Sequence, residues 1–348
     1  MEQAFFLTGR VGLPSIRCII KQAPESMHIK DVLATVNDEF QAVDKLIHEQ
    51  LESRVPLVEK IAEYIVSSGG KRIRPLLVLL TAKAFDRADA DAVKLATVIE
   101  FLHTATLLHD DVVDTSDMRR GNPTANARWG NAPSVLVGDF LYSRAFEMMV
   151  ELRSMPVMKI LSNATCVIAE GEVMQLTNVK NPDTTEAQYM EVIHGKTAML
   201  FEASTHSAAA LLELSDADRT ALKEYGKELG MAFQLVDDVL DYEGDAEEMG
   251  KNVGDDLAEG KATLPLIHAM AHANEDDRQL IRNAIRKGGL DDMNEVLRVV
   301  KSCGSLDYTR QQANACRDRA QKHLENLPAS VARDALAALA AIAVERTT

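Results

Sequence analysis

Apolar residues recur at helical spacing through most of the chain. Between residues 29 and 67, for example, Val43, Ile47 and Leu51 follow one another at four-residue intervals, which places them on one face of a helix. The same pattern predicts further helices, which begin near residues 75 and 92, continue to about 177 after a break, cover 185–213 and 216–242, and resume after residue 265.

Polar and glycine-containing stretches separate these helices. Residues 86–92 form a polar connector, and the Gly, Asn and Pro residues of 121–133 and 178–185 are typical of loops. Residues 242–265 are charged and glycine-bearing, and loops of this length are often functional lids. Strand signals are weak because β-branched alternation is short and hairpin turns are lacking. The pattern therefore predicts an all-α fold.

The chain length allows one large core or two modest ones. Because the 348 residues contain no low-complexity linker, we expect one domain over residues 27–348. Residues 1–26 have only short apolar pieces, which favours a poorly ordered extension over a signal peptide and makes Met27 a second candidate start. No apolar run is long enough to predict a transmembrane segment.

Charge and cysteine content narrow the class of partner and the compartment. The net charge is −15 and no basic run interrupts it, so we expect no nucleic-acid partner. The four cysteines form neither a CxxC pair nor a metal-ligand pattern, which is typical of free thiols in a reducing cytosol. We therefore expect a cytoplasmic protein.

The segment LLHDDVVDTSDMRRGNPTAN (107–126) places three acids within five residues and then two adjacent arginines. On a helix, residues four apart lie on one face, so Asp110 and Asp114 point the same way, with Asp111 beside them. A solvated helix face is the ordinary explanation for one such cluster. A solvated face does not explain, however, why three mutually repelling acids lie so close together.

A second cluster makes the solvated-face explanation much weaker. In FQLVDDVLD (233–241), Asp237 and Asp241 share one helix face and Asp238 flanks them. If both helices border one cavity, six carboxylates converge there, and divalent cations are needed to offset their repulsion. Hard oxygen ligands favour Mg²⁺, which completes its coordination shell with water and substrate phosphates. The sequence therefore predicts a magnesium-dependent phosphate site.

Basic residues elsewhere fit the same chemistry. SSGGKRIRP (67–75) fails the P-loop pattern, yet its glycine pair, Lys71 and Arg74 at a helix start suit an anion. His103 lies two turns before the first aspartate cluster on the same face, although a lone histidine is more often a core residue. Lys251 and Lys261 lie in the lid-like stretch, where solvated lysines are the usual case.

Four segments together resemble the trans-type polyprenyl diphosphate synthase family: GGKRIRP (69–75), residues 107–126, HGKTAMLFEAS (194–204) and residues 233–265. The resemblance covers nearly the whole chain from about Met27. It implies an isoprenoid-synthase-type helical bundle around a deep central cavity, a homodimer, and Mg²⁺-dependent head-to-tail prenyl transfer. The implied substrates are isopentenyl diphosphate and an allylic diphosphate such as farnesyl diphosphate.

The resemblance also implies roles for individual residues. The contacts to isopentenyl diphosphate are Lys71, Arg74, His103 and Arg120. The contacts to the allylic substrate are Arg119, Lys196, Thr197, Gln234 and Lys251, with Lys261 as a further phosphate ligand. The Lys196–Thr197 region and Gln234 also offer oxygens to a carbocation. The metal ligands are Asp110, Asp114 and Asp237, supported by Asp111, Asp238 and Asp241.

Product length is expected to depend on the wall beneath the metals. Ala105 and Thr106 lie one helical turn before Asp110, and short-chain family members often carry a bulky aromatic there. Small residues leave room for a growing tail, so we expect a long product, C40 by resemblance, for the ubiquinone side chain. Phe146 and Met149 are candidates for the tunnel floor, although ordinary core packing explains them equally well.

Three functions other than prenyl transfer are also compatible with parts of the sequence. His109–Asp110 is an HD dipeptide, but HD-type phosphohydrolases need further histidine ligands, which the second aspartate cluster lacks. A terpene cyclase has the same fold, but its second metal motif usually mixes Asn, Ser or Thr with Glu. A regulatory subunit of a heteromeric synthase usually lacks one aspartate cluster, whereas both are intact here.

Overall fold

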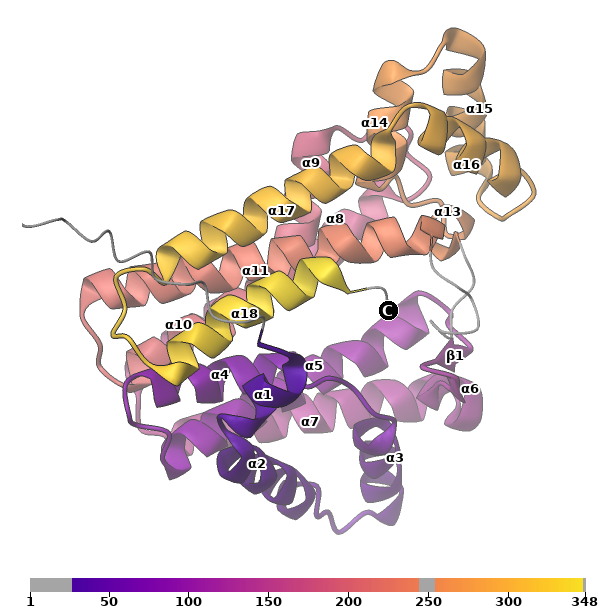
Figure 1. Ribbon diagram of the computed structural model, residues 1–348. Coiled ribbons are helices and arrows are strands. Elements are labelled where there is room, and N and C mark those ends of the chain that lie inside the picture. The colour runs from indigo at the N-terminus through magenta and orange to yellow at the C-terminus, as the bar shows by residue number, and fades with distance from the viewer. Residues whose placement is uncertain (1–26, 244–253, 347–348) are drawn as a thin grey trace, which may run out of the picture.

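Nearly all regular structure in the computed structural model, which describes residues 27–243 and 254–346, is helical (Figure 1). The first half contains α1 (Ile29–Ala34), α2 (Asn37–Gln50), α3 (Pro56–Ser67), α4 (Ile73–Ala84), α5 (Ala90–Val113), β1 (Met118–Arg119), β2 (Asn122–Pro123), α6 (Ala125–Trp129), α7 (Asn131–Glu151) and α8 (Met155–Asn178). The second half contains α9 (Glu186–Ile193), the π-turn η1 (His194–Ala198), α10 (Met199–Leu211), α11 (Asp216–Glu243), α13 (Asp255–Ala258), α14 (Leu264–His272), α15 (Glu275–Lys287), α16 (Met293–Ser302), α17 (Ser305–His323) and α18 (Val331–Glu345).

Helix α5 packs between α4 and α7 in the main bundle. The Asp89 side chain caps its start by accepting hydrogen bonds from the backbone N–H groups of Asp91 and Ala92. Phe101, Leu102 and many other apolar side chains of α5 are buried, so the helix is surrounded by core. Its last turns nevertheless carry His103 and the first aspartate cluster, which the bundle therefore holds rigidly.

Helices α10 and α11 form the other side of the bundle and pack on each other. In Figure 1, α17 runs along α11, and α18 lies between these helices and α4, in agreement with the contacts of α18 to α4, α11 and α17. The fully buried Tyr225 of α11 donates a hydrogen bond of 2.7 Å to the Leu336 carbonyl of α18. This packing sets the position of the second aspartate cluster near the end of α11.

A second, smaller core lies at one end of the molecule, where α13–α16 gather at the upper right of Figure 1. Tyr242 at the end of α11 packs there with Leu257, Leu266 and Val299. The core anchors the segment that carries Lys261, because that segment connects α13 to α14.

Most predicted elements are confirmed. The all-α expectation is correct, the connector before α5 and the loop after α8 fall where predicted, and α11 covers the predicted range. In the described part of the chain, no helix combines the length and the apolar character that crossing a membrane requires. The predicted N-terminal extension (1–26) and Lys251 lie outside the described residues.

Three local expectations are wrong. Residues 121–133 hold β2, α6 and the start of α7, because Thr124 caps α6 and Gly130, at φ 87°, ends it. The predicted 185–213 helix is interrupted by a π-turn. The hairpin was missed because each strand has two residues, too few for an alternating pattern.

Candidate active site

A cavity of about 970 Å³ opens between the end of α5, the start of α4, the π-turn and the end of α11. Asp110 and Asp114 line it from α5, and Asp237, Asp238 and Asp241 line it from α11. Members of both aspartate clusters therefore border one hollow, although Asp111 is not among them. Between them the walls carry both cationic and apolar side chains.

Asp110 occupies an unfavourable environment for a charged group. Burial is the main cause that raises the pKa of this carboxyl to about 7; Glu172 and Asp114 also raise it, and Lys196 and Arg119 oppose the increase. The ionised form of Asp110 is therefore unfavourable at this position. A cation bound there would relieve this conflict.

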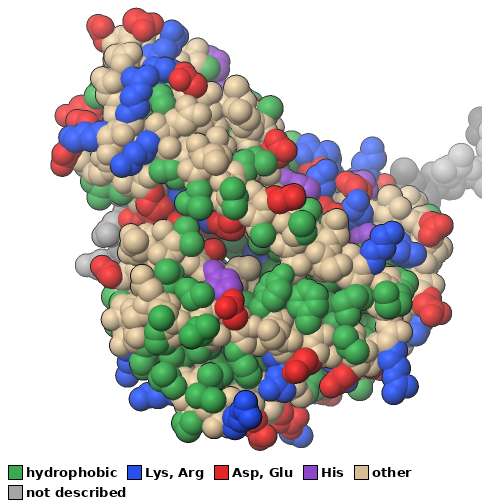
Figure 2. Space-filling model, turned by 180° about the vertical axis from the view of Figure 1, so that it is seen from behind, with side chains coloured by type: hydrophobic (Ala, Val, Ile, Leu, Met, Phe, Trp, Pro, Cys, Tyr) green, Lys and Arg blue, Asp and Glu red, His purple; other side chains and the backbone are tan. Residues whose placement is uncertain are grey.

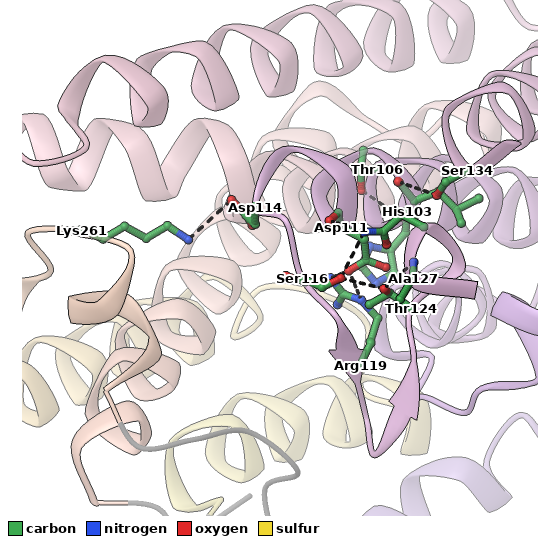
Figure 3. A network of polar contacts seen from close by, with 12 residues as sticks. His103, Thr106, Asp111, Asp114, Ser116, Arg119, Thr124, Ala127, Ser134 and Lys261 are labelled. Carbon is green, nitrogen blue, oxygen red and sulfur yellow. Dashed lines mark hydrogen bonds and ion pairs between the residues drawn. The ribbon is translucent and has the colours of Figure 1, made fainter. Parts of the chain in front are cut away.

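Asp111 is turned away from the cavity and is fully buried. Arg119 donates to its Oδ1 through Nε at 2.9 Å and lies 2.7 Å away through Nη2. Figure 3 shows Arg119 reaching from the hairpin back to Asp111, while Lys261 points toward Asp114 from the opposite side. In this structure Asp111 therefore holds the hairpin, and Lys261 lies 3.9 Å from Asp114.

The second cluster is also divided among different partners. Asp237 pairs with Arg346 at 2.6 Å. Asp238 is almost fully buried and accepts hydrogen bonds from Tyr189 and Gln234. Asp241 accepts hydrogen bonds from backbone N–H groups at the start of α13.

The donor set fits a magnesium ion that keeps water and substrate ligands. Among residues 27–243 and 254–346, no three acidic, imidazole or thiol side chains lie close enough together to enclose one ion. Mg²⁺ commonly needs only one or two carboxylates when phosphate oxygens complete its shell. The cavity-facing pair Asp110 and Asp114, and Asp237 opposite, offer such carboxylates.

The hairpin brings two arginines to the cavity. Arg120 and Gly121 both have positive φ angles, as a tight two-residue hairpin turn requires. The Arg120 guanidinium then packs onto Gly70, where a Cβ atom would lie 2.6 Å from its Nη1. Burial lowers the pKa of Arg120, with Arg119 adding to the effect and Glu100 opposing it.

Arg74 and His103 form a buried pair beside Arg120. Arg74 Nη1 donates to His103 Nε2 at 3.1 Å, and its guanidinium lies 4.4 Å from the centre of the Phe201 ring. Burial and the adjacent arginines hold the pKa of His103 well below its usual value, so the ring is neutral. Lys71 also lines the cavity, and burial followed by Arg346 lowers its pKa. This basic region suits an anion.

The π-turn presents Lys196 and Thr197 to the cavity. Such turns are frequent at functional sites because they widen the helix and re-aim side chains. Gly171 of α8 allows the close approach, since a Cβ there would lie 2.7 Å from the Lys196 backbone nitrogen. Lys196 donates to Glu172 at 2.9 Å, and Thr197 donates to Gln234 Oε1 at 2.8 Å.

None of the four residues expected to influence product length is among those that line the cavity. Ala105 and Met149 are buried in the main core, Phe146 packs against Tyr142, and Thr106 donates to the His103 carbonyl. Thr104 and Leu107 instead border the cavity from α5. The chain-length assignment stays a prediction.

Arg346, Tyr189 and Glu100 line the cavity but had not been selected from the sequence. Arg346 stands alone at the end of an Ala-rich helix, and Tyr189 and Glu100 lie in ordinary amphipathic stretches. No local motif marks them, because their roles depend on which helices meet. Among the three, only Glu100 had an indication in the sequence, because it is an acid three residues before His103 on the same helix.

These features define a helical protein with acidic and basic side chains around one cavity, an arrangement suited to phosphate groups and a divalent cation. The polyprenyl synthetase family matches residues 55–302, and this chain belongs to that family. It is a trans-polyprenyl diphosphate synthase, an enzyme of prenyl chain elongation.

Its relatives are similar over almost their full length. The chain is 51% identical to the octaprenyl diphosphate synthase of Escherichia coli, covering 92% of this chain and 99% of the relative. It is 48% identical to an all-trans-nonaprenyl-diphosphate synthase (geranyl-diphosphate specific) of Rhodobacter capsulatus, covering 91% and 98%. A Caulobacter crescentus polyprenyl synthase, crystallised with calcium and isoprenyl diphosphate, superposes with a TM-score of 0.89 at 42% identity, covering 93% and 99%.

Proposed function

We propose that this enzyme adds isopentenyl diphosphate units to farnesyl diphosphate and releases all-trans octaprenyl diphosphate, a C40 chain. The observation that carries the chemistry is that both aspartate clusters and the basic residues border one cavity. The C40 length is supported by the names of the octaprenyl synthases at 50–51% identity. We further propose a cytoplasmic enzyme whose product becomes the ubiquinone side chain.

The two diphosphates would occupy opposite sides of the cavity. Lys71, Arg74, His103 and Arg120 provide positive charge and hydrogen-bond donors for isopentenyl diphosphate. Arg119, Lys196 and Lys261 do so for the allylic diphosphate. Mg²⁺ held by Asp110, Asp114 and Asp237 would neutralise the leaving diphosphate and assist its departure.

The protein's own groups then control the reactive carbon. Oxygens of Thr197 and Gln234 lie beside the cavity, where they stabilise the positive charge that develops as the allylic C–O bond breaks. Phe201, Phe233 and Leu107 line the same space and exclude water from the cation. The isopentenyl double bond attacks, and the released diphosphate accepts the proton.

The decisive experiment is incubation with labelled isopentenyl diphosphate, farnesyl diphosphate and Mg²⁺, followed by chromatographic sizing of the product. We expect a C40 diphosphate, and its loss in Asp110→Asn and Asp237→Asn. Simple hydrolysis, a cyclised hydrocarbon, or activity only in the presence of a second protein would contradict the proposal.

We also propose that the enzyme is a homodimer. Hydrophobic side chains gather on the face shown in Figure 2. Leu136 and Val150 of α7, and Met155, Val173 and Leu176 of α8, are all more than half exposed. An apolar surface of this kind is typical of a subunit interface. Sedimentation should show a dimer, and Val173→Asp with Leu176→Asp should shift it toward monomer; an unchanged profile would contradict this interface.

A further inference from the structure

Three hydrogen bonds connect α9, α11 and the π-turn along one wall of the cavity. The Tyr189 hydroxyl donates to Asp238 Oδ2 at 2.5 Å. Gln234 Nε2 donates to Asp238 Oδ1 at 2.8 Å, and Thr197 Oγ1 donates to Gln234 Oε1 at 2.8 Å. All four residues line the cavity. We call this set the Tyr189 relay.

We propose that Tyr189 is a positioning residue for prenyl transfer, which acts by fixing the orientation of the Gln234 amide. This inference rests on the proposed function, in which Thr197 and Gln234 face the developing cation. It assigns Asp238 to the relay rather than to a metal ion.

The orientation follows from which atoms can donate. Both Asp238 oxygens act as acceptors, so the group of Gln234 that faces Asp238 is its NH₂ donor. The amide oxygen is thereby directed to Thr197, whose hydroxyl hydrogen it accepts. The lone pairs of the Thr197 oxygen remain for the cavity. A flipped amide would instead place its positively polarised NH₂ group near the developing allylic cation, which would oppose ionisation.

Asp238 is suited to this role because it is enclosed. It is only 1% exposed, and each of its oxygens accepts one of the two hydrogen bonds. Its neighbour Asp237 has a side chain that is 43% exposed. Without the Tyr189 hydroxyl, one buried carboxylate oxygen would lack a partner, and the side chain would gain by rotating away from Gln234.

Tyr225 provides a matched control. It is also fully buried, and its hydroxyl also makes one hydrogen bond, but to the backbone carbonyl of Leu336 and away from the cavity. Tyr225→Phe and Tyr189→Phe therefore each remove one buried hydroxyl group that donates a single hydrogen bond. A purely structural role predicts the same effect for both variants.

The test measures the single-turnover rate of the first condensation, KM for both substrates, the Mg²⁺ concentration at half-maximal activity, and Tm. For Tyr189→Phe we expect a rate about tenfold lower, with KM for isopentenyl diphosphate and the Mg²⁺ requirement within about twofold of wild type. Tyr225→Phe should lower Tm by a comparable amount and leave the rate within about twofold. Combining Tyr189→Phe with Gln234→Leu should cost no more than Gln234→Leu alone.

Other outcomes would overturn the assignment. Equal rates for the two tyrosine variants would make Tyr189 structural. A Tyr189→Phe defect that excess Mg²⁺ restores would assign Asp238 to the metal, and additive losses in the double variant would separate Tyr189 from Gln234. Wild-type enzyme that fails to lengthen the primer would instead refute the proposed function itself.

Discussion

The Arg120 guanidinium occupies the space where a side chain of Gly70 would begin, since a Cβ at residue 70 would lie 2.6 Å from Arg120 Nη1. The glycine before the basic helix start therefore does more than permit a turn. It allows Arg120 of the hairpin to border the same cavity as Lys71 and Arg74, so that cations from two distant segments line one anion-binding region.

Gly70→Ala should weaken substrate binding more than it weakens the fold. The new methyl group displaces Arg120, so we expect KM for isopentenyl diphosphate to rise about tenfold. Gly69→Ala is the control, because Gly69 also has positive φ but has nothing within 4 Å of its Cβ position. Both substitutions should cost about 1 kcal/mol of stability. Steady-state kinetics with equal KM values for the two variants would contradict this explanation.

Arg346 is expected to compete with a metal ion for Asp237. Its guanidinium lies 2.6 Å from the Asp237 carboxylate and 3.8 Å from the centre of the Phe233 ring. Arg346→Gln removes this charge and should lower the Mg²⁺ concentration at half-maximal activity several-fold. Arg333→Gln is the control, because Arg333 pairs with its neighbour Asp334 on α18. An unchanged or higher Mg²⁺ requirement in Arg346→Gln would refute the competition.

Asp110 should make stability depend on pH in the chelated protein. Its pKa is about 7 when folded and near 3.8 when unfolded, so the unfolded chain releases this proton first. The free energy of unfolding therefore falls as pH rises from about 4 to 7. Asp110→Asn lacks this loss and should be more stable than wild type by about 1–3 kcal/mol at pH 8.

Denaturant unfolding in EDTA measures this difference. The gap between Asp110→Asn and wild type should shrink as pH falls toward 4, because the unfolded wild-type chain begins to take up the proton that the folded protein already holds. A gap that stays constant from pH 4 to 8 would show that the Asp110 pKa is not raised.

Ala105→Phe should shorten the product. If the growing chain passes beside α5, a phenyl ring one turn before Asp110 obstructs it, and chromatography should show a polyprenyl diphosphate shorter than C40. Ala105→Ser is the size-matched control and should keep the wild-type length. Because Ala105 is fully buried, the larger side chain should also cost about 1–3 kcal/mol of stability. Unchanged chain length in a folded Ala105→Phe enzyme would refute this path.

Helical spacing placed the acids of each aspartate cluster on one helix face, but it did not predict that neighbouring aspartates would have different partners. Asp110 of α5 and Asp237 of α11 both line the cavity. The adjacent Asp111 contacts Arg119 instead, and Asp238 contacts Tyr189 and Gln234. Neighbouring positions on a helix point in different directions, and their partners come from other elements, so only the packed structure reveals them.

The two local structures that shape the site were also beyond the sequence pattern. The hairpin that carries Arg120 is too short to show alternation, and the π-turn at His194–Ala198 adds one residue to a turn without changing the local composition. Both depend on close backbone or side-chain approaches at Gly70 and Gly171. A glycine in the sequence indicates backbone freedom at that position, but it does not indicate which neighbouring residue packs where a side chain would lie.

Lys261 directly precedes Ala262, which belongs to the smaller hydrophobic core around α13–α16, whereas Asp114, 3.9 Å from its Nζ, follows α5 of the main core. A small core opens at a lower free-energy cost than a large one. On heating, we therefore expect activity to disappear before most of the circular dichroism signal does. The temperature at which this enzyme stops working would then be set by α13–α16, not by the bundle that contains its aspartates.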